Sequence, residues 1–389
     1  MKTMYYVSYM NLGRTGTIGI LNKIISQIKA FEECGYKVLY IYAENSILRS
    51  NFIEANTNDF NVKQIRNSID NILYKENFST VDFVYIRFDI FTYKFLRLLK
   101  KISNSKAKIL LEIPTYPFIG EFRYYLKEAL LGKKFVKAFK YCVKIIQYPL
   151  YSKIMHNYIE RIVTFSEDDN IWGIKTTTTF NGIDTNKCVK ISFNKRDKHH
   201  VTMICVSSCV KWHGYDRVIE GMREYYKKNK EVIVRLKIVG EGPELSFYKQ
   251  LVNKYNLCPY VDFYGNVTGD DLNKLYNEAD IALDAMGRHR VGVLYNSSLK
   301  GKEYAFYGLP IVSGTKTEFD NDRSFPFYFR VPADESPISI NDIILFVEKI
   351  EMITNYRKKI HEYAISHFDM KMAIEPIITY MNSNVSEYF

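Results

Sequence analysis

Short apolar runs alternate with segments of helical periodicity along the first half of the chain. Runs typical of buried strands stand at residues 5–9, 37–42, 83–88, 108–113 and 162–165. Between the first two runs, apolar residues recur at helical spacing from Leu21 to Phe31, and Gly35 is placed to end that helix. Residues 166–169 are typical of a capped helix start. Strands that alternate with helices over short connections predict a parallel sheet with helices on both faces.

The second half of the chain repeats this alternation. We expect strands at residues 201–206, 234–239, 261–263, 281–283 and 310–313. Helices are expected between them at residues 216–229, 244–255, 270–277 and 299–307. A last helical stretch covers residues 342–354 and 356–381, and no strand is expected after Val331.

The polar and basic residues that follow positions 181–184 mark the best boundary between two such units. A chain of 389 residues is also too long for one ordinary core. We therefore predict an α/β fold of two doubly wound, Rossmann-like domains that face each other across a cleft, at residues 1–180 and 181–365. The remaining residues, 366–389, are expected to form a helix that packs back on the first domain.

Composition adds a preference for acidic partners. The chain has 47% hydrophobic and 25% charged residues, which excludes a disordered or fibrous protein. Its 54 basic and 43 acidic residues give a formal net charge of +11. Such a charge favours nucleotide phosphates, anionic lipid headgroups or nucleic acid, although a solvated lysine surface explains it equally well.

The cysteines and the amino terminus bear on the compartment. None of the six cysteines forms a Cys-x-x-Cys pair, so free thiols in a reducing compartment are expected rather than a disulfide framework or a zinc site. The first residues lead directly into a strand pattern instead of a secretory signal, and no window of about 18 apolar residues predicts a spanning helix. We expect a cytoplasmic protein.

Two segments of the last third have the character of a nucleotide-sugar site. Residues 236–244 form an apolar strand that runs into a turn with Gly240 and Gly242. Residues 299–313 form a short helix that opens with a basic residue and closes at Gly308. Glycine lets backbone N–H groups approach an anion, and a helix N-terminus adds positive potential there. Glu303, one turn into this helix, is placed to accept hydrogen bonds from ribose hydroxyls.

Motifs in this order and spacing identify a family. They are residues 181–184, 213–220, 239–244, 263–265 with 275–280, and 303–310. Over nearly its whole length the chain resembles the GT-B glycosyltransferases, and specifically the retaining family 4 type that builds bacterial surface polysaccharides. The resemblance implies an acceptor-binding first domain and a donor-binding second domain. It also implies transfer from a UDP- or GDP-sugar to a hydroxyl of a glycan, with the anomeric configuration retained and without a metal or cofactor.

The resemblance also assigns residues to the donor. Glu303 matches the second glutamate of the family's Glu-x7-Glu motif, which binds the donor ribose, whereas Tyr295 replaces the first glutamate. Ser297 and Ser298 are candidates for contact with sugar or phosphate, or they merely cap the helix that begins near Leu299. The predicted donor-binding residues are Gly240, Glu241, Gly242, Pro243, Arg290, Ser297, Ser298 and Glu303.

Departure of the diphosphate requires positive charge when no metal supplies it. The family uses an arginine and a lysine, and the matching positions here are Ser208 and His213. Lys211, His213 and Lys300 are therefore the candidate catalytic residues, and the two lysines are favoured because an ammonium is charged at any working pH. Arg217 is a further candidate, with a salt bridge that fastens a surface helix as the alternative.

Acceptor-binding residues are expected in the first domain. The glycine-rich loop at 13–19 lies where the family has its acceptor loop, although a plain turn explains it equally well. Prolines at 114 and 117 stiffen the chain just past a buried strand, so the polar residues around them are expected at the cleft. The predicted acceptor-binding residues are Gly16, Glu112, Thr115, Tyr116 and Glu121.

Residues 122–153 mix seven lysines with aromatic and aliphatic residues at helical spacing. Lysines on one helical face and aromatics on the other suit an interfacial helix on anionic lipid. A surface helix that packs on its own domain is the alternative. An acceptor carried on a polyprenyl diphosphate favours the membrane interpretation, which places the protein on the inner face of the plasma membrane.

Three other functions compete with glycosyl transfer. The chain is also compatible with a non-catalytic subunit that binds sugar nucleotide or lipid, and the departures at Ser208 and Tyr295 favour that alternative. A sugar-nucleotide epimerase or hydrolase requires an additional pair of carboxylates, and no convincing pair is present. Nucleic-acid binding rests on the net charge alone, and we expect none.

Overall fold

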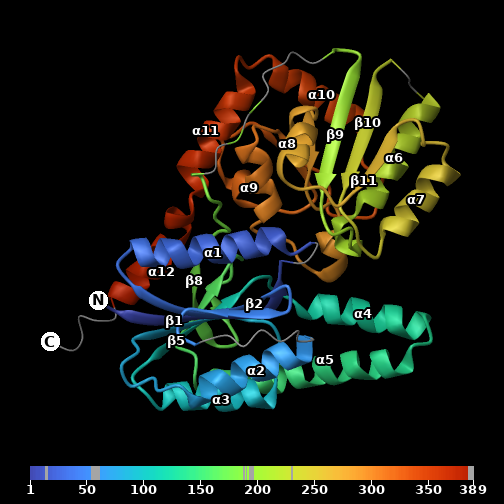
Figure 1. Cartoon of the computed structure of the whole chain (residues 1–389). Coiled ribbons are helices and arrows are strands. Elements are labelled where there is room, and N and C mark those ends of the chain that lie inside the picture. Colours follow the sequence, from blue (N-terminus) through green and yellow to red (C-terminus); the bar gives the residue numbers. More distant parts are fainter. Residues whose placement is uncertain are drawn as a thin grey trace. The chain divides into compact units, whose positions relative to one another are not determined.

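The computed structural model divides into two compact units, Met1–Gly182 with Met370–Phe389, and Ile183–Asp369 (Figure 1). It describes residues 1–13, 16–53, 62–186, 189, 191, 197–228 and 231–383. The chain leaves the first unit after Gly182 and returns to it at Met370, so the last helix belongs to the first unit. Each unit is described by itself.

The first unit is built on an eight-stranded sheet of order β3-β2-β1-β4-β5-β6-β8-β7. The neighbours from β2 to β8 pair in parallel, whereas β3 and β7 are antiparallel strands at the two edges. Its strands are β1 (Thr3–Leu12), β2 (Lys37–Glu44), β3 (Ile47–Ser50), β4 (Phe83–Arg87), β5 (Lys108–Ile113), β6 (Arg161–Thr164), β7 (Asn170–Ile171) and β8 (Ile174–Thr178).

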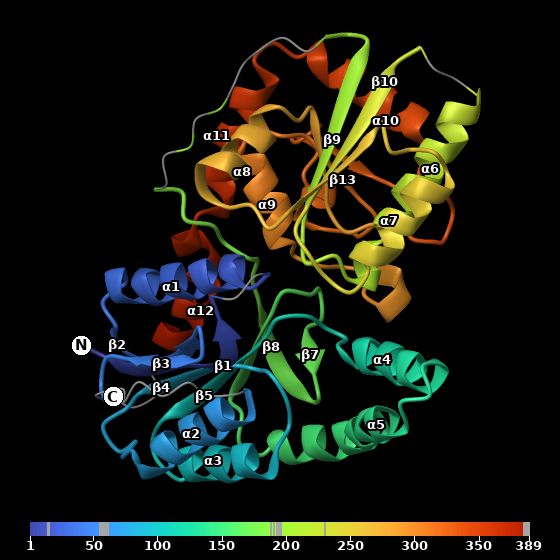
Figure 2. The ribbon, with the colours of Figure 1, turned by 45° about the vertical axis from the view of Figure 1, so that its right-hand side comes forward.

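Helices cover both faces of this sheet. The helices are α1 (Ile18–Glu33), α2 (Val62–Lys75), α3 (Tyr93–Ser103), α4 (Ile119–Leu131), α5 (Phe135–Met155) and α12 (Met370–Ser383). In Figures 1 and 2, α1 and α12 lie on one face and α2 and α3 on the other. Alternate residues of β4 follow this division, because Tyr85 packs in the core with α1 and α12, and Val84 packs in the core with α2 and α3. A strand covered on both faces is apolar without alternation, as this one is.

One predicted helix is absent. Residues 166–169 do not open a helix but lead into the hairpin of β7 and β8, in which Ile171 pairs with Ile174. The two residues between them, Trp172 and Gly173, have φ angles of 58° and 81°. Two consecutive residues with positive φ make the tight turn that joins antiparallel strands. The chain therefore reverses its direction where we expected a helix.

The second unit is built on a six-stranded sheet of order β11-β10-β9-β12-β13-β14, in which every pair is parallel. Its strands are β9 (His200–Val206), β10 (Ile233–Val239), β11 (Val261–Gly265), β12 (Ile281–Leu283), β13 (Ile311–Ser313) and β14 (Tyr328–Arg330). Its helices are α6 (Tyr215–Lys228), α7 (Leu245–Lys254), α8 (Gly269–Asn277), α9 (Leu299–Phe306), α10 (Ile340–Glu351) and α11 (Tyr356–Phe368), with short 3-10 turns η1 (Lys211–His213), η2 (Arg288–Val291) and η3 (Glu318–Asn321).

The prediction of an α/β chain with two sheets of mainly parallel strands is confirmed, apart from the antiparallel edge strands β3 and β7 of the first sheet. That the two domains face each other across a cleft stays a prediction. Within the part of the chain that the structure describes, every helix is too short or too polar to cross a membrane.

Candidate functional site

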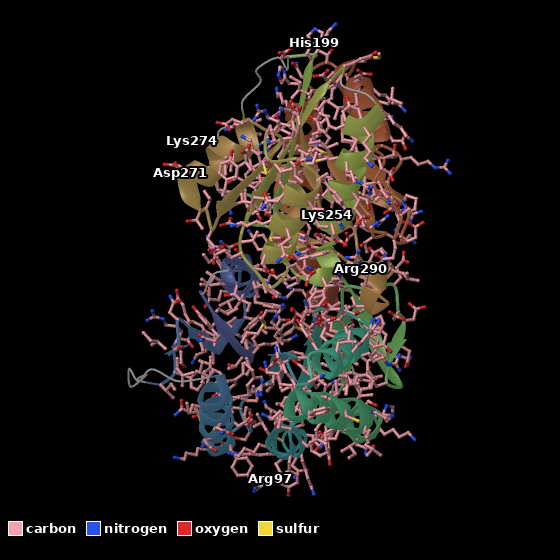
Figure 3. The ribbon with its side chains drawn as sticks, turned by 90° about the vertical axis from the view of Figure 1, so that its right-hand side faces the viewer. Arg97, His199, Lys254, Asp271, Lys274 and Arg290 are labelled. Atoms are coloured by element: carbon pink, nitrogen blue, oxygen red, sulfur yellow. The ribbon has the colours of Figure 1, made fainter. Side chains whose placement is uncertain are left out.

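The strand order of the second unit reverses between β9 and β12. The chain proceeds from β9 outward to β10 and β11, and then returns to the other side of β9 as β12. Open α/β sheets bind their ligands beyond the carboxyl ends of the strands at such a reversal. His199, just before β9, and Arg290, in the loop after β12, lie at opposite ends of this unit (Figure 3). The loops that follow β9 and β12 therefore form the candidate site.

Glycines hold the loops after β9 and β10 together. A Cβ atom at Gly240 would lie 1.9 Å from the Ser207 carbonyl oxygen, and one at Gly242 would lie 1.8 Å from that of Ser208. Gly240 also has a φ of 116°, which side chains disfavour. The packing of the two backbones therefore requires both glycines. Contact of the turn from Gly240 to Pro243 with a nucleotide stays a prediction. Glu241, Gly242 and Pro243 are exposed and Gly240 is half-buried, which is compatible with it.

The loop after β12 is fastened to the loop after β9. A Cβ atom at Gly214 would lie 2.6 Å from the Gly287 nitrogen, so the two chains meet backbone to backbone. The Met286 N–H donates to the His213 carbonyl oxygen at 2.7 Å. This close packing fixes the distance between the residues that the two loops carry.

Arg290 belongs to this fastening. Its guanidinium donates to both carboxylate oxygens of Asp216 at 2.9 and 2.8 Å, to the Lys211 carbonyl oxygen at 2.9 Å and to Glu335. Burial alone lowers the pKa of Arg290, but the hydrogen bonds to Glu335 and Asp216 raise it above its ordinary value. The expectation that Arg290 binds the donor is therefore not supported, because its donors are already used within the unit.

His213 is not a source of positive charge. Its ring is buried, and burial together with the charges of Lys300 and Arg288 lowers its pKa well below 6.5. A neutral imidazole does not neutralise a diphosphate, so these surroundings disfavour the catalytic role of His213, which stays a prediction. Arg217 has the salt bridge that we named as its alternative, because its buried guanidinium lies 3.2 Å from Asp334 Oδ1. It also donates to the carbonyl oxygens of Met286, Pro332 and Ser336.

Lys300 and Lys211 remain the candidate cations. The Nζ of Lys300 is buried and lies 3.4 Å from Asp284 Oδ1, directly after β12. Burial lowers the pKa of Lys300, and Asp284 partly restores it. Lys211 is more exposed; its Nζ lies 3.6 Å from Glu244 Oε2 and 5.1 Å from the centre of the Phe247 ring. The site therefore has one enclosed ammonium and one at its surface.

The two serines before α9 have different roles. Ser298 is the N-cap of α9, since its hydroxyl accepts from the Gly301 N–H at 3.2 Å and donates to Asp284 at 2.8 Å. Ser297 accepts from Lys302 Nζ at 2.8 Å. Both serines are buried. Capping thus accounts for Ser298 but not for Ser297, and donor contact by either hydroxyl stays a prediction.

The sequence did not single out Lys302. This buried lysine bonds to Ser297 and to Glu318, and burial lowers its pKa against the opposing effect of Glu318. Two lysines on either side of Gly301 were the available signal, but only the packing shows that Lys300 and Lys302 have different carboxylate partners.

Tyr304 holds α9 over the ends of the central strands. Its hydroxyl accepts from the Val206 N–H at 3.0 Å and lies 3.4 Å from the Leu283 carbonyl oxygen. Glu303, the preceding residue, is half-buried and lies beside Tyr276, whose pKa is raised first by burial and then by this carboxylate. Glu303 therefore sits on a helix fixed to β9 and β12, and its contact with ribose stays a prediction.

Glu112 of the first unit is not presented to solvent. Its carboxylate is fully buried, accepts from Lys23 at 3.1 Å and from Tyr85 at 2.6 Å, and pairs with Arg87. Burial alone raises the pKa of Glu112, but the charges of Lys23 and Arg87 lower it to about 2. The prediction that Glu112 faces the cleft is therefore wrong, because the acid neutralises two buried cations that we did not single out.

The other predicted acceptor residues are accessible. Thr115, Tyr116 and Glu121 are half-buried and follow the carboxyl end of β5, and Gly16 is exposed with a φ of 83°. Burial raises the pKa of Tyr116. Nothing in the contacts of these four residues decides for or against an acceptor.

The cysteines of the described residues do not pair with one another. The described cysteines, at 34, 142, 205, 209 and 258, have free thiols, and Cys188 lies outside the described residues. Among the residues that the structure describes, no group of three His, Cys, Asp or Glu side chains is arranged to hold a metal ion.

Part of the candidate site lies in a region that is similar to a known family. Residues 190–287 match the family described as glycosyl transferases group 1. This region therefore resembles a glycosyltransferase domain. It contains the loops after β9 and β10 and the beginning of the loop after β12. No curated protein sequence matches the chain.

Solved structures share the fold over the whole chain. A sucrose-phosphate synthase from Thermosynechococcus elongatus is 11% identical with a TM-score of 0.65, over 100% of this chain and 99% of that one. HepE of Anabaena, in complex with UDP-glucose, is 11% identical with a TM-score of 0.58 over 100% and 99%. A glycosyltransferase from Rickettsia africae is 14% identical with a TM-score of 0.59 over 99% and 98%. At such identities these structures establish the fold alone.

Proposed function

We propose that the protein transfers a sugar from a UDP- or GDP-sugar to a hydroxyl of a glycan, with retention of configuration and without a metal. The observation that carries this proposal is the position of Lys300. A buried ammonium stands at the N-terminus of α9, where β9 and β12 end, next to a domain that matches glycosyltransferases. A helix N-terminus and a cation together favour an anionic leaving group.

The roles of the residues follow from their surroundings. In the reaction the bond between the anomeric carbon and the phosphate oxygen breaks, and a bond from that carbon to the acceptor oxygen forms. Lys300 and Lys211 stabilise the negative charge that develops on the departing diphosphate. Neutral His213 acts at most as a hydrogen-bonding group. Glu303 accepts hydrogen bonds from the ribose, and the proton of the acceptor hydroxyl leaves without an assigned base.

The acceptor is proposed to be lipid-linked, and the pair of α4 and α5 supports this. Exposed apolar side chains follow one face of α5 and the end of α4. Phe135 and Phe139 are 69% and 71% exposed. The others are Leu130, Leu131, Val136, Ile146 and Leu150. These exposed side chains do not pack on their own domain, although the opposite face of α5 does so through Tyr148, Tyr151 and Met155. Tyr125 and Tyr141 stack on each other between the two helices, with ring centres 5.4 Å apart.

Lysines surround this apolar face. Lys133 and Lys134 form the turn between the helices, and Lys127, Lys137, Lys140 and Lys153 are exposed on the helices themselves. An apolar strip with a basic border suits the headgroup region of an anionic bilayer, because apolar contact and charge attraction act together. We accordingly propose that this unit docks on the inner face of the plasma membrane, where a lipid-linked surface glycan is assembled.

The proposal is tested by turnover of a panel of UDP- and GDP-sugars with lipid-linked acceptors, together with the variant Glu303→Ala. The wild type is expected to form product with one donor. Glu303→Ala is expected to weaken donor binding by about 2–3 kcal/mol, the loss for hydrogen bonds to a charged group, in calorimetry. The control is Glu278→Ala, which removes an exposed carboxylate two residues after Tyr276. Unchanged donor affinity in Glu303→Ala would remove the ribose role.

A non-catalytic subunit is the second candidate. Neutral His213 and the serine at position 208 leave this site with fewer cations than the family pattern requires. Donor binding without product from any acceptor in the panel would favour a subunit that binds sugar nucleotide within an assembly.

A further inference from the structure

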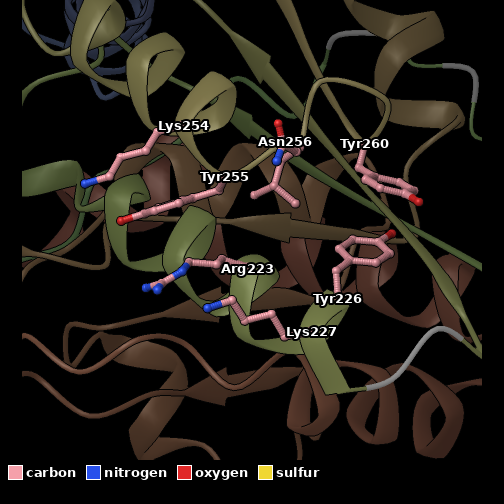
Figure 4. Close-up of a pocket in the computed structure, with 8 residues that line it drawn as sticks. Arg223, Tyr226, Lys227, Lys254, Tyr255, Asn256 and Tyr260 are labelled. Atoms are coloured by element: carbon pink, nitrogen blue, oxygen red, sulfur yellow. The ribbon is translucent and has the colours of Figure 1, made fainter.

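A pocket of about 490 Å³ lies in the second unit, apart from the candidate donor site. It is formed where α6 and α7 end and β11 begins, and Figure 4 shows the side chains that line it. Those that the argument uses are Arg223, Tyr226, Lys227, Lys254, Tyr255 and Tyr260. The candidate donor site lies instead at the loops where α6 and α7 start, so the two sites are at opposite ends of these helices.

One wall of the pocket is rigid. The Tyr226 hydroxyl donates to the Val234 carbonyl oxygen and accepts from the Val234 N–H, both at 2.9 Å. Its ring stacks on that of Tyr260, with ring centres 3.9 Å apart and planes at 18°. Two hydrogen bonds and a stacked neighbour leave Tyr226 no other position. The pocket is therefore preformed on this side, as small-molecule sites generally are.

The other wall is basic and lacks a counter-ion. The Arg223 guanidinium lies 4.8 Å and the Lys254 ammonium 5.7 Å from the centre of the Tyr255 ring. In Figure 4 the side chains of Arg223, Lys227 and Lys254 extend toward the same side of the pocket. No carboxylate lines the pocket, and none of the three cations forms an ion pair with another described residue.

Three neighbouring cations without an acid repel one another, and a bound anion removes that cost. Arginine offers planar paired donors that match phosphate oxygens, and lysines add point charges. We propose that this pocket binds the phosphate group of a small phosphate ester. The tyrosine wall then contacts the organic part of the ester. A soluble metabolite and a lipid headgroup present the same phosphate chemistry, and the experiment distinguishes them.

The test is calorimetric titration of the full chain with glycerol 3-phosphate. The affinity of the double variant Arg223→Gln/Lys254→Gln is expected to fall by about tenfold or more, because two charge-assisted contacts are lost. Arg235→Gln/Lys249→Gln removes one arginine and one lysine from exposed positions outside the pocket and is expected to bind as the wild type does. Lys300→Gln is expected to retain this binding, which separates the pocket from the donor site.

Cosedimentation with vesicles of phosphatidylcholine and phosphatidic acid tests whether the phosphate that binds belongs to a lipid headgroup. The four lysines 133, 134, 137 and 140 are replaced by glutamine in this assay, so that the pair of α4 and α5 does not mask the pocket. Loss of sedimentation in the Arg223→Gln/Lys254→Gln variant assigns the phosphate to a headgroup, and unchanged sedimentation with weaker glycerol 3-phosphate binding assigns it to a soluble ester. The proposal is overturned if the wild type does not bind glycerol 3-phosphate and the chain with the four lysines replaced does not sediment with vesicles, or if the control variant weakens binding equally. Failure of glycosyl transfer leaves it intact.

Discussion

Lys300 is the residue at which charge, burial and position combine. Its ammonium is enclosed at the end of β12 with Asp284 at 3.4 Å, and burial lowers its pKa from 10.5. A lysine with a lowered pKa is charged at low pH and loses its proton as pH rises toward the ordinary range. Diphosphate binding requires the charged form, so the ability to bind a donor depends on pH through this residue.

We therefore expect donor affinity to fall as pH rises, below the pH at which an ordinary lysine titrates. Lys300→Arg should remove this dependence, because a guanidinium stays charged. Lys300→Gln should weaken binding by about 1.5–3 kcal/mol at low pH and also remove the dependence. The measurement is calorimetry of the donor at several pH values. Lys211→Gln is the control, and it should lower affinity while keeping the slope; the same slope in Lys300→Gln would contradict the assignment.

The buried carboxylate of Glu112 connects three elements of the first unit through ion pairs. It neutralises Lys23 of α1 and Arg87 of β4, and so joins a helix to two strands. Removing the carboxylate leaves two cations buried without an acid, which costs more than removing one cation and leaving a balanced pair. Glu112→Gln should therefore destabilise the protein by about 3–5 kcal/mol in urea unfolding, and Lys23→Met by less. Equal stability of Glu112→Gln and wild type would contradict this.

The same group gives the pH dependence of stability a sign. The pKa of Glu112 is about 2 instead of 4.5, so its contribution is present above pH 4.5 and is lost as pH falls toward 2. The pKa of Lys23 is about 7 instead of 10.5, so the unfolded chain binds more protons between these values and stability rises with pH there. Lys23→Met should remove the rise in the free energy of unfolding between about pH 7 and pH 10.5, measured by urea unfolding at several pH values.

At the scale of elements, the periodicity of apolar residues predicted the position of individual strands and helices. The strands at 108–113 and 281–283 have the predicted bounds, and Gly35 ends α1 with a φ of 88°. Sequence pattern did not predict Glu112, because its burial depends on Arg87 beside it in the parallel register and on Lys23 from α1. Similarly, the sequence alone indicates a free cation at Arg290, whereas in the fold this residue pairs with Asp216 and Glu335 from other segments. Local pattern thus located the loops of the site, and tertiary pairing decided which charges remain available.

The exposed face of α4 and α5 makes its own prediction. Phe135→Ser/Phe139→Ser should reduce cosedimentation with anionic vesicles, since the apolar contact with the bilayer is lost. Because both rings are exposed, the free energy of unfolding should change by no more than about 0.5 kcal/mol. Tyr93→Ser on α3 is the matched control, because this ring is 69% exposed in the same unit but lies outside the pair. Undiminished sedimentation of the double variant would rule out the membrane role.

At the scale of the whole molecule, the chain has two units with separate hydrophobic cores. One sheet of the first unit has a core on each face, and the second unit has its own core around β9, β10 and β12. The residues proposed for the donor all belong to the second unit, which is a continuous stretch of chain from Ile183 to Asp369. Donor binding should therefore stabilise the two units unequally.

Hydrogen exchange of the full chain with and without its donor measures this difference. A ligand at one hundred times its Kd stabilises the unit that binds it by about 2.7 kcal/mol. We expect slower exchange in the loops after β9, β10 and β12 and in α9, because the donor contacts or orders their backbones. The central strands β4 and β5 belong to another core, so their exchange should change less. Lys300→Gln should abolish the protection at the same donor concentration. Protection confined to the first unit would place the donor there and contradict the assignment of Lys300, Lys211 and Glu303.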